Sequence, residues 1–134
     1  MRPNQITLHA SADIADLQRG GPEEGIEIET YTYKLDEVDR AVLDGQEEGF
    51  ARLHVKKGTD QIVGTTIVAA HAGDIVSETM VLMKSGKGLK ALTGTIHPYP
   101  THAEVIKRAG NLWRKAHFTA GTKKVLRKWF EWTR

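Results

Sequence analysis

Residues 49–70, GFARLHVKKGTDQIVGTTIVAA, contain two runs of strand-forming residues on either side of a short polar segment. The first run predicts a strand from Gly49 to Lys57. The second predicts a strand from Ile62 to Ala70, with Gly64 as a weak point or a bulge. Gly58-Thr59-Asp60 predicts a turn between them. The two strands are therefore expected to form an antiparallel hairpin.

The residues around this hairpin predict one more strand and several helices. Residues 26–33 alternate in the manner of a strand, and residues 35–42 form a short helix that stops near Gly45. Short-range patterns also predict a helix over residues 13–19, although residues 1–25 are weakly patterned as a whole. A strand, a short helix, a hairpin and then helices indicate the α+β class, with helices packed on an antiparallel β-sheet in one domain, residues 1–134.

Apolar residues at helical spacing mark the helices of the second half. Gly86 and Gly88 are expected to end the first of them, a helical turn follows near Leu89, and Thr101 is the expected N-cap of the next. A basic amphipathic helix is expected at the C-terminus, within residues 118–134. The members of these apolar faces are Ala72, Ile75, Val76, Thr79, Met80 and Met83, then Val105, Ile106, Ala109, Leu112, Trp113 and Ala116, and finally Val125, Leu126, Trp129 and Phe130.

Composition excludes several classes of chemistry. The chain has 134 residues and no cysteine, so it offers no disulfide, no CxxC redox pair and no thiolate metal site. No apolar run approaches the roughly 18–20 residues that span a membrane, and the first residues do not resemble a signal peptide. We expect a cytoplasmic protein.

Charge is distributed unevenly along the chain. Residues 1–50 hold 12 acids and 4 bases, a net charge of −8, whereas residues 51–134 hold 15 bases and 5 acids, a net of +10. Such asymmetry occurs in proteins that bind nucleic acid or membranes, but also where two halves of a domain attract each other. We favour the second interpretation, because the bases are scattered over several elements, and we expect no nucleic-acid or membrane partner.

Nucleotide-binding motifs are absent from the sequence. No GxGxxG follows a strand and no GxxxxGK[ST] occurs. The segment from Lys84 to Gly88 is rich in Gly and Lys but closes a helix, and helix C-termini do not attract anions.

Among the six histidines, His54 is expected at the surface or a sheet edge and His71 at a helix cap.

The segment HPYPTHAE, residues 97–104, is the best candidate site. Its prolines stiffen the approach to a helix, and Glu104 has the chemistry to orient a neighbouring His or Tyr for acid–base work. The same residues also fit a capping box, in which Glu104 bonds the backbone N–H of Thr101. From the residues alone we favour the capping box.

The chain also resembles a known family. The stretch Thr66 to Glu78 (TIVAAHAGDIVSE), Gly88-Leu89 and Ile96 to Glu104 are similar to the C-terminal dimerisation domain of the pyridine nucleotide-disulfide oxidoreductases, over roughly residues 25–117. The Pro-Tyr-Pro-Thr version is most similar to the mercuric-reductase-like branch, and residues 1–24 match poorly. The resemblance implies an antiparallel sheet with helices on one face and a two-fold dimer.

The resemblance also implies the site residues. In the family, a His directly before Pro-Thr pairs with a Glu three residues after the Thr and reaches the partner subunit's flavin and disulfide. Glu104 matches that carboxylate, whereas Tyr99 occupies the His position and a histidine, His97, lies two residues earlier. The implied catalytic residues are therefore Glu104, Tyr99 and His97.

Together, these expectations describe the chain as one domain of a larger enzyme. The chain is expected to be the interface domain of an FAD- and NAD(P)H-dependent disulfide-type oxidoreductase, either excised or naturally truncated. Its expected partners are a second copy and upstream FAD and NAD domains. It is expected to bind no cofactor and to be inactive alone, because it has no Gly-rich FAD motif and no CxxxxC pair. The alternative is a free-standing dimeric α+β binding or regulatory module without redox activity.

The dimer is expected to use one of two apolar helical faces. One comprises Ile75, Val76, Met80 and Met83, and the other comprises Ile106 and Trp113. Each is long enough to form a self-complementary two-fold contact.

Overall fold

The computed structural model of the chain describes residues 5–6 and 27–132, with the side chains of residues 27–118. A four-stranded sheet has the order β1-β4-β3-β2, and each neighbouring pair is antiparallel. Its strands are β1 (Gln5–Ile6), β2 (Ile28–Lys34), β3 (Phe50–Lys56) and β4 (Ile62–Val68). The predicted strand and hairpin are therefore confirmed. β1 was not predicted, and the helix expected over residues 13–19 lies outside the described residues.

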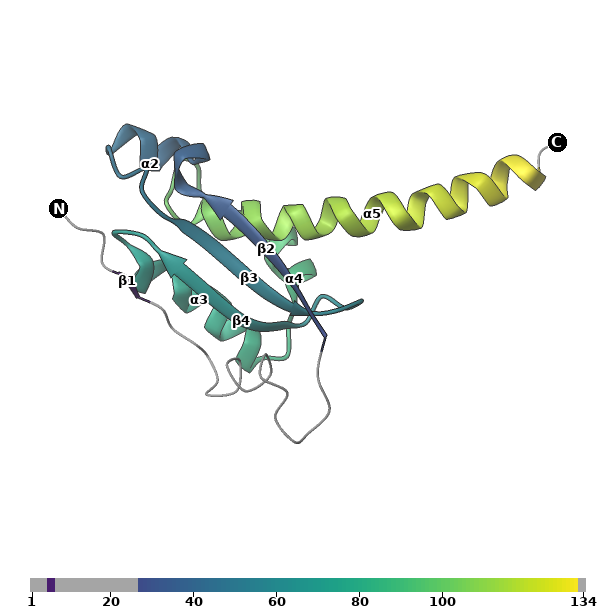
Figure 1. Cartoon of the computed structure of the whole chain (residues 1–134), viewed down its shortest axis with the longest axis horizontal. Coiled ribbons are helices and arrows are strands. Elements are labelled where there is room, and N and C mark those ends of the chain that lie inside the picture. Colours follow the sequence, from purple (N-terminus) through teal and green to yellow (C-terminus); the bar gives the residue numbers. More distant parts are fainter. Residues whose placement is uncertain (1–4, 7–26, 133–134) are drawn as a thin grey trace.

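Two short helices lie between β2 and β3, and three longer elements follow β4. They are the 3₁₀ helix η1 (Leu35–Glu37), then α2 (Asp39–Leu43), α3 (Ala72–Lys84), α4 (Leu89–Gly94) and α5 (Glu104–Trp132). The helices α3, α4 and α5 lie on one face of the sheet, and α5 extends well past its edge (Figure 1). This arrangement confirms the α+β fold with helices on one face. Among the described residues, no helix combines the length and hydrophobicity needed to cross a membrane.

The core lies between the sheet and these helices. Leu53 of β3, Ile67 of β4 and Ile106 of α5 are almost completely buried. Burying a side chain of this size stabilises a fold by roughly 1.5–3 kcal/mol. His54 is also buried, at 7% exposure, so the surface or edge position predicted for it is wrong. The reason is that β3 has a neighbouring strand on each side, and the Nδ1 atom of His54 lies 2.9 Å from Thr30 Oγ1.

Two local features predicted from glycines are confirmed. The pairing of β3 with β4 shifts between His54 and Val55, which face Gly64 and Ile62 respectively, so a bulge lies next to Gly64. At the end of α3, Gly86 has a φ of 67°, and Lys87 N–H donates to Leu82 O at 2.9 Å. This is a Schellman C-cap. Gly86 therefore ends α3, as predicted, whereas Gly88 is the N-cap residue of α4, so the prediction that Gly88 also closes the helix is wrong.

The two faces predicted for dimerisation are already used by the core. Ile75 and Val76 are at most 4% exposed, Ile106 is fully buried and Trp113 is 6% exposed. Those predictions are wrong for these four residues, because the same helical stripes pack on the sheet. Met80 and Met83 are partly buried against that core.

The structure also differs from two predictions about the helices, one on where a helix begins and one on which side chains are buried. α5 continues unbroken from Glu104 to Trp132, so no separate helix begins near residue 118 or 122. Ala116, which is predicted on an apolar face, is exposed, and so is Val42 in the short helix predicted over residues 35–42. Helical periodicity alone does not decide which of these positions is buried.

The β3–β4 turn holds the helical layer in place. Asp60 accepts two backbone hydrogen bonds from the start of α4, Leu89 N–H to Asp60 O at 2.8 Å and Lys90 N–H to Asp60 Oδ2 at 3.2 Å. Trp113 Nε1 of α5 donates to Thr59 O at 3.1 Å. Gly88 permits this approach, since a Cβ atom there would overlap the carbonyl and the carboxylate of Asp60.

We predict that Gly88→Ala destabilises the domain by about 1–3 kcal/mol, because the added methyl group forces the turn away from α4. Gly94→Ala is the matched control in the same helix, since a Cβ atom at Gly94 meets nothing within 4 Å. It should be neutral or stabilising by up to about 1 kcal/mol. Urea unfolding of both variants checks the prediction, and equal stabilities would contradict the close contact.

Candidate functional site

The segment between α4 and α5, residues 95–103, carries the predicted site residues. The Tyr99–Pro100 peptide bond is cis. The side chain of Tyr99 is 67% exposed, and its hydroxyl donates to Asp39 Oδ2 of α2 at 2.6 Å. Asp39 and Tyr99 are far apart in sequence, so the fold brings α2 to the predicted site.

His97 has a different environment. Its side chain is only 6% exposed. Nε2 lies 2.9 Å from Glu78 Oε1 of α3, and Nδ1 lies 3.1 Å from Thr95 O. Each ring nitrogen therefore faces an acceptor oxygen, and the side chain fastens the segment to α3. His97 therefore pairs with the carboxylate of Glu78 on α3, and not with Glu104, which is the carboxylate of the predicted site.

Glu104 is the first residue of α5 and is 9% exposed. Its Oε1 atom accepts hydrogen bonds from Arg108, at 2.8 Å from Nε and 2.7 Å from Nη2. Its Oε2 atom is buried and has no hydrogen-bond donor among the described residues. The structure thus fixes one carboxylate oxygen and leaves the other one buried without a donor among the described residues.

The capping box is not formed. Thr101 Oγ1 donates to Pro98 O at 2.9 Å, and α5 begins at Glu104, two residues later than the box requires. A guanidinium one helical turn away makes charge-assisted hydrogen bonds to the carboxylate, which are stronger than a bond to a backbone N–H. The preference for the cap was therefore wrong, and the spacing of Glu104 and Arg108 was the signal that could have indicated it.

Acidic neighbours set the protonation behaviour of the phenols. The hydrogen bond to Asp39 raises the pKa of Tyr99, and the negative charges of Asp39 and Glu104 act in the same direction. Burial is the main cause that raises the pKa of Tyr33, followed by a hydrogen bond to Glu37. Both phenols therefore favour the neutral form, in which the hydroxyl can donate a hydrogen bond.

A second polar network next to the site was not predicted. His102 Nε2 lies 2.9 Å from Asp44 Oδ2, and Arg40 binds the same carboxylate at 2.7 Å. The hydrogen bonds from Arg40 and His102 lower the pKa of Asp44. The rings of His71 and His102 are 4.7 Å apart. Only the i, i+4 spacing of Arg40 and Asp44 is visible in the sequence.

The described side chains contain no group of three His, Asp or Glu residues that could hold a metal ion. His71 precedes α3 as its N-cap residue but makes no side-chain capping bond. Its Nδ1 atom lies 3.9 Å from Asp74 Oδ2 instead. The arrangement at residues 95–108 therefore offers hydrogen-bond donors and acceptors rather than a metal site.

Comparison with known proteins gives one family. The family model for the pyridine nucleotide-disulphide oxidoreductase dimerisation domain matches residues 22–110. Mercuric reductase from Streptomyces lividans is 32% identical over 104 residues, which cover 78% of this chain and 22% of that protein. Mitochondrial dihydrolipoyl dehydrogenase from Caenorhabditis elegans is 28% identical over 95 residues, covering 67% of this chain and 19% of the other. The chain thus spans about a fifth of these relatives.

Solved structures show the same fold. LpdA from Mycobacterium tuberculosis superposes with a TM-score of 0.65 at 19% identity, covering 74% of this chain and 21% of that one. The HOCl-induced flavoprotein disulfide reductase RclA from Escherichia coli gives 0.64 at 18% identity, covering 71% and 22%. At these identities the similarity concerns the fold.

We predict that Asp39→Asn lowers the pKa of the Tyr99 phenol, because it removes the negative charge that disfavours the phenolate. Tyr31 is the internal reference, since burial is the main cause that raises its pKa to about 12. NMR titration of the labelled tyrosine Cζ atoms measures both groups, and Tyr99→Phe assigns the resonance. An unchanged Tyr99 pKa, or an equal shift at Tyr31, would show that Asp39 does not act on Tyr99.

Proposed function

The chain belongs to the family of pyridine nucleotide-disulphide oxidoreductase dimerisation domains, and we propose that it is the interface domain of a larger FAD- and NAD(P)H-dependent oxidoreductase. In this proposal it pairs two subunits and contributes Glu104 and Tyr99 to the active site of the partner subunit. The observation that carries the proposal is the buried Oε2 atom of Glu104, which has no donor among the described residues and follows closely in sequence after the exposed Tyr99.

The described sheet does not have the architecture of a dinucleotide-binding domain. All pairs of strands in the described sheet are antiparallel, so the sheet has no parallel βαβ unit of the kind whose Gly-rich turn binds a dinucleotide. The FAD and NAD(P)H of the proposed enzyme would therefore be held by other domains. The described residues of the candidate site can add hydrogen bonding and proton exchange to that chemistry.

Glu104 and Tyr99 suit such a supporting role. A buried polar atom without a partner is unusual in a folded protein, and a donor from outside the chain would satisfy it. Arg108 holds the carboxylate in place through two hydrogen bonds to the other oxygen. The neutral hydroxyl of Tyr99 is exposed and can bind a ligand if Asp39 releases it. His97 acts as a positioning residue, because its bond to Glu78 fixes the segment that carries Tyr99.

The subunit contact is proposed on the outer surface of α3 and the segment before Tyr99. Val81 is 67% exposed and Ile96 is 91% exposed. The bond between Glu78 and His97 joins the two elements that carry them, and Glu78 and Val81 are one helical turn apart on α3. A second copy of the chain would cover these side chains.

We predict that the chain forms a dimer in sedimentation experiments, and that Val81→Asp or Ile96→Asp weakens it at least about tenfold by burying a charge at the contact. Leu43→Asp is the matched control, because Leu43 is 72% exposed but lies on α2. A monomer at every concentration, or equal weakening by the control, would contradict this interface.

A complementation experiment tests the contribution to the partner's site. A mercuric reductase truncated before its own dimerisation domain is mixed with this chain, and NADPH-dependent mercuric-ion reduction is measured. We expect the chain to restore activity, and Glu104→Gln to lower the restored turnover by at least about 100-fold. Glu48→Gln, which changes an exposed carboxylate, should have no effect. Restored activity that is independent of Glu104 and of Tyr99 would leave dimerisation alone as the function.

A further inference from the structure

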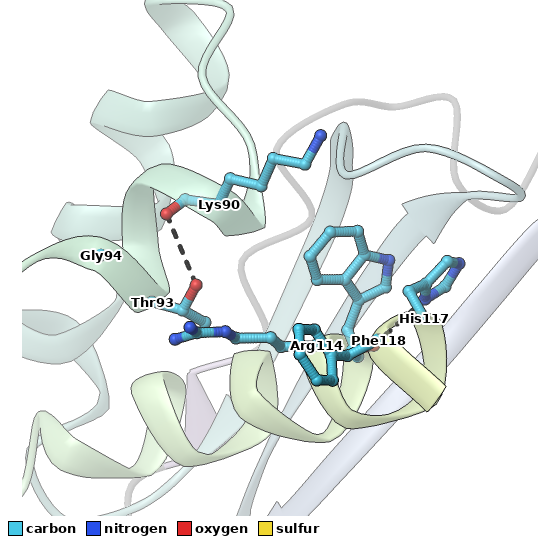
Figure 2. A pocket seen from close by; sticks show the side chains of 7 residues that line it. Lys90, Thr93, Gly94, Arg114, His117 and Phe118 are labelled. Atoms are coloured by element: carbon cyan, nitrogen blue, oxygen red, sulfur yellow. Dashed lines mark hydrogen bonds between the residues drawn. The ribbon is translucent and has the colours of Figure 1, made fainter. Parts of the chain in front are cut away.

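A separate cavity lies between α4 and α5, away from the Glu104 site. It has a volume of about 400 Å³ and is lined by Lys90, Thr93, Gly94, Trp113, Arg114, His117 and Phe118. In Figure 2, the Arg114 side chain extends toward Thr93 and Gly94 of α4, while Phe118 and His117 lie on the neighbouring turn of α5. Gly94 leaves one wall open, because a Cβ atom there would meet nothing within 4 Å.

Two cations border this cavity. The Lys90 ammonium group and the Arg114 guanidinium group belong to exposed residues, and neither forms an ion pair with another side chain that the structure describes. Two carboxylates are near, but both have other partners. Asp60 accepts the backbone N–H of Lys90, and Glu29 accepts the hydroxyl of Tyr31 and lies 3.6 Å from His117 Nε2. Both carboxylates keep their negative charge, but neither lines the cavity, so the charged side chains that line it are the cations Lys90 and Arg114.

Aromatic rings supply the apolar walls. The rings of Trp113 and His117 are stacked, with centroids 4.8 Å apart and an interplanar angle of 29°. Trp113 is fixed by its bond to Thr59 O, and His117 Nδ1 lies 3.1 Å from Trp113 O. Phe118 is 67% exposed. Rigid aromatic walls lose little entropy when a flat ring packs on them.

We propose that this cavity binds a small aromatic anion, whose ring packs mainly on Phe118 and on the small exposed part of Trp113, and whose sulfonate, carboxylate or phosphate group is bound by Arg114 and Lys90. Thr93 contributes shape only, because its hydroxyl already donates to Leu89 O at 2.8 Å. Planar guanidinium groups recognise such oxyanions through two parallel N–H bonds. The site is independent of the Glu104 carboxylate and of the proposed subunit contact.

A pair of fluorescent probes tests the site on the full chain. Anilinonaphthalene sulfonate has the aromatic body and the negative charge, and phenylnaphthylamine has the same body without the charge. We expect saturable binding of the anionic probe, weaker by about tenfold in Arg114→Gln, which loses a charge-assisted hydrogen bond. Arg114→Lys should retain part of the affinity. The neutral probe should bind weakly and equally to wild type and Arg114→Gln.

Two further variants separate this cavity from general attraction of the dye. Gly94→Leu places a side chain in the cavity without changing charge and should abolish binding of the anionic probe. Lys84→Gln removes a positive charge at the end of α3, outside the cavity, and should leave the affinity unchanged. Melting curves establish that each variant is folded. The proposal is wrong if Gly94→Leu binds as wild type does, or if Lys84→Gln weakens binding as much as Arg114→Gln.

Discussion

The bonds between Asp60 and the start of α4 are the contact on which the rest of the structure depends. The β3–β4 turn places a carbonyl and a carboxylate where the N-terminal N–H groups of α4 are unsatisfied. Because Gly88 has no side chain, turn and helix meet directly. α4 in turn supports α5, and it ends where the segment carrying His97 and Tyr99 begins. A shift of this turn would therefore move the candidate site and the α4–α5 cavity together.

Within the connecting segment, neighbouring polar side chains take different partners. His97 binds α3 through Glu78, Tyr99 binds α2 through Asp39, and His102 binds Asp44 just after α2. The segment is consequently held from two sides while the phenol remains exposed. This explains how a short loop can present Tyr99 at the surface in a defined position without burying it.

The division of charge along the sequence also has a structural counterpart. Acidic residues of the first half meet basic or hydroxyl groups of the second half, as in Lys57 with Glu27 and His117 with Glu29. These contacts support the interpretation that the halves of the domain attract each other. Exposed ion pairs contribute only about 0–1 kcal/mol each, so burial of the core provides most of the stability of the domain. The charges help to orient the two halves of the domain relative to each other.

The sequence by itself determined the hairpin, the end of α3 at Gly86 and the family, because each depends on a local pattern or on a run of matching residues. Only the tertiary structure decided which partner each polar side chain takes. It placed Arg108 on Glu104 in place of the cap, and Glu78 on His97. It also buried His54 and most of the two apolar faces predicted for the dimer, namely Ile75, Val76, Ile106 and Trp113. Periodicity shows that a helix has an apolar face, but which surface covers that face depends on packing between segments distant in the chain.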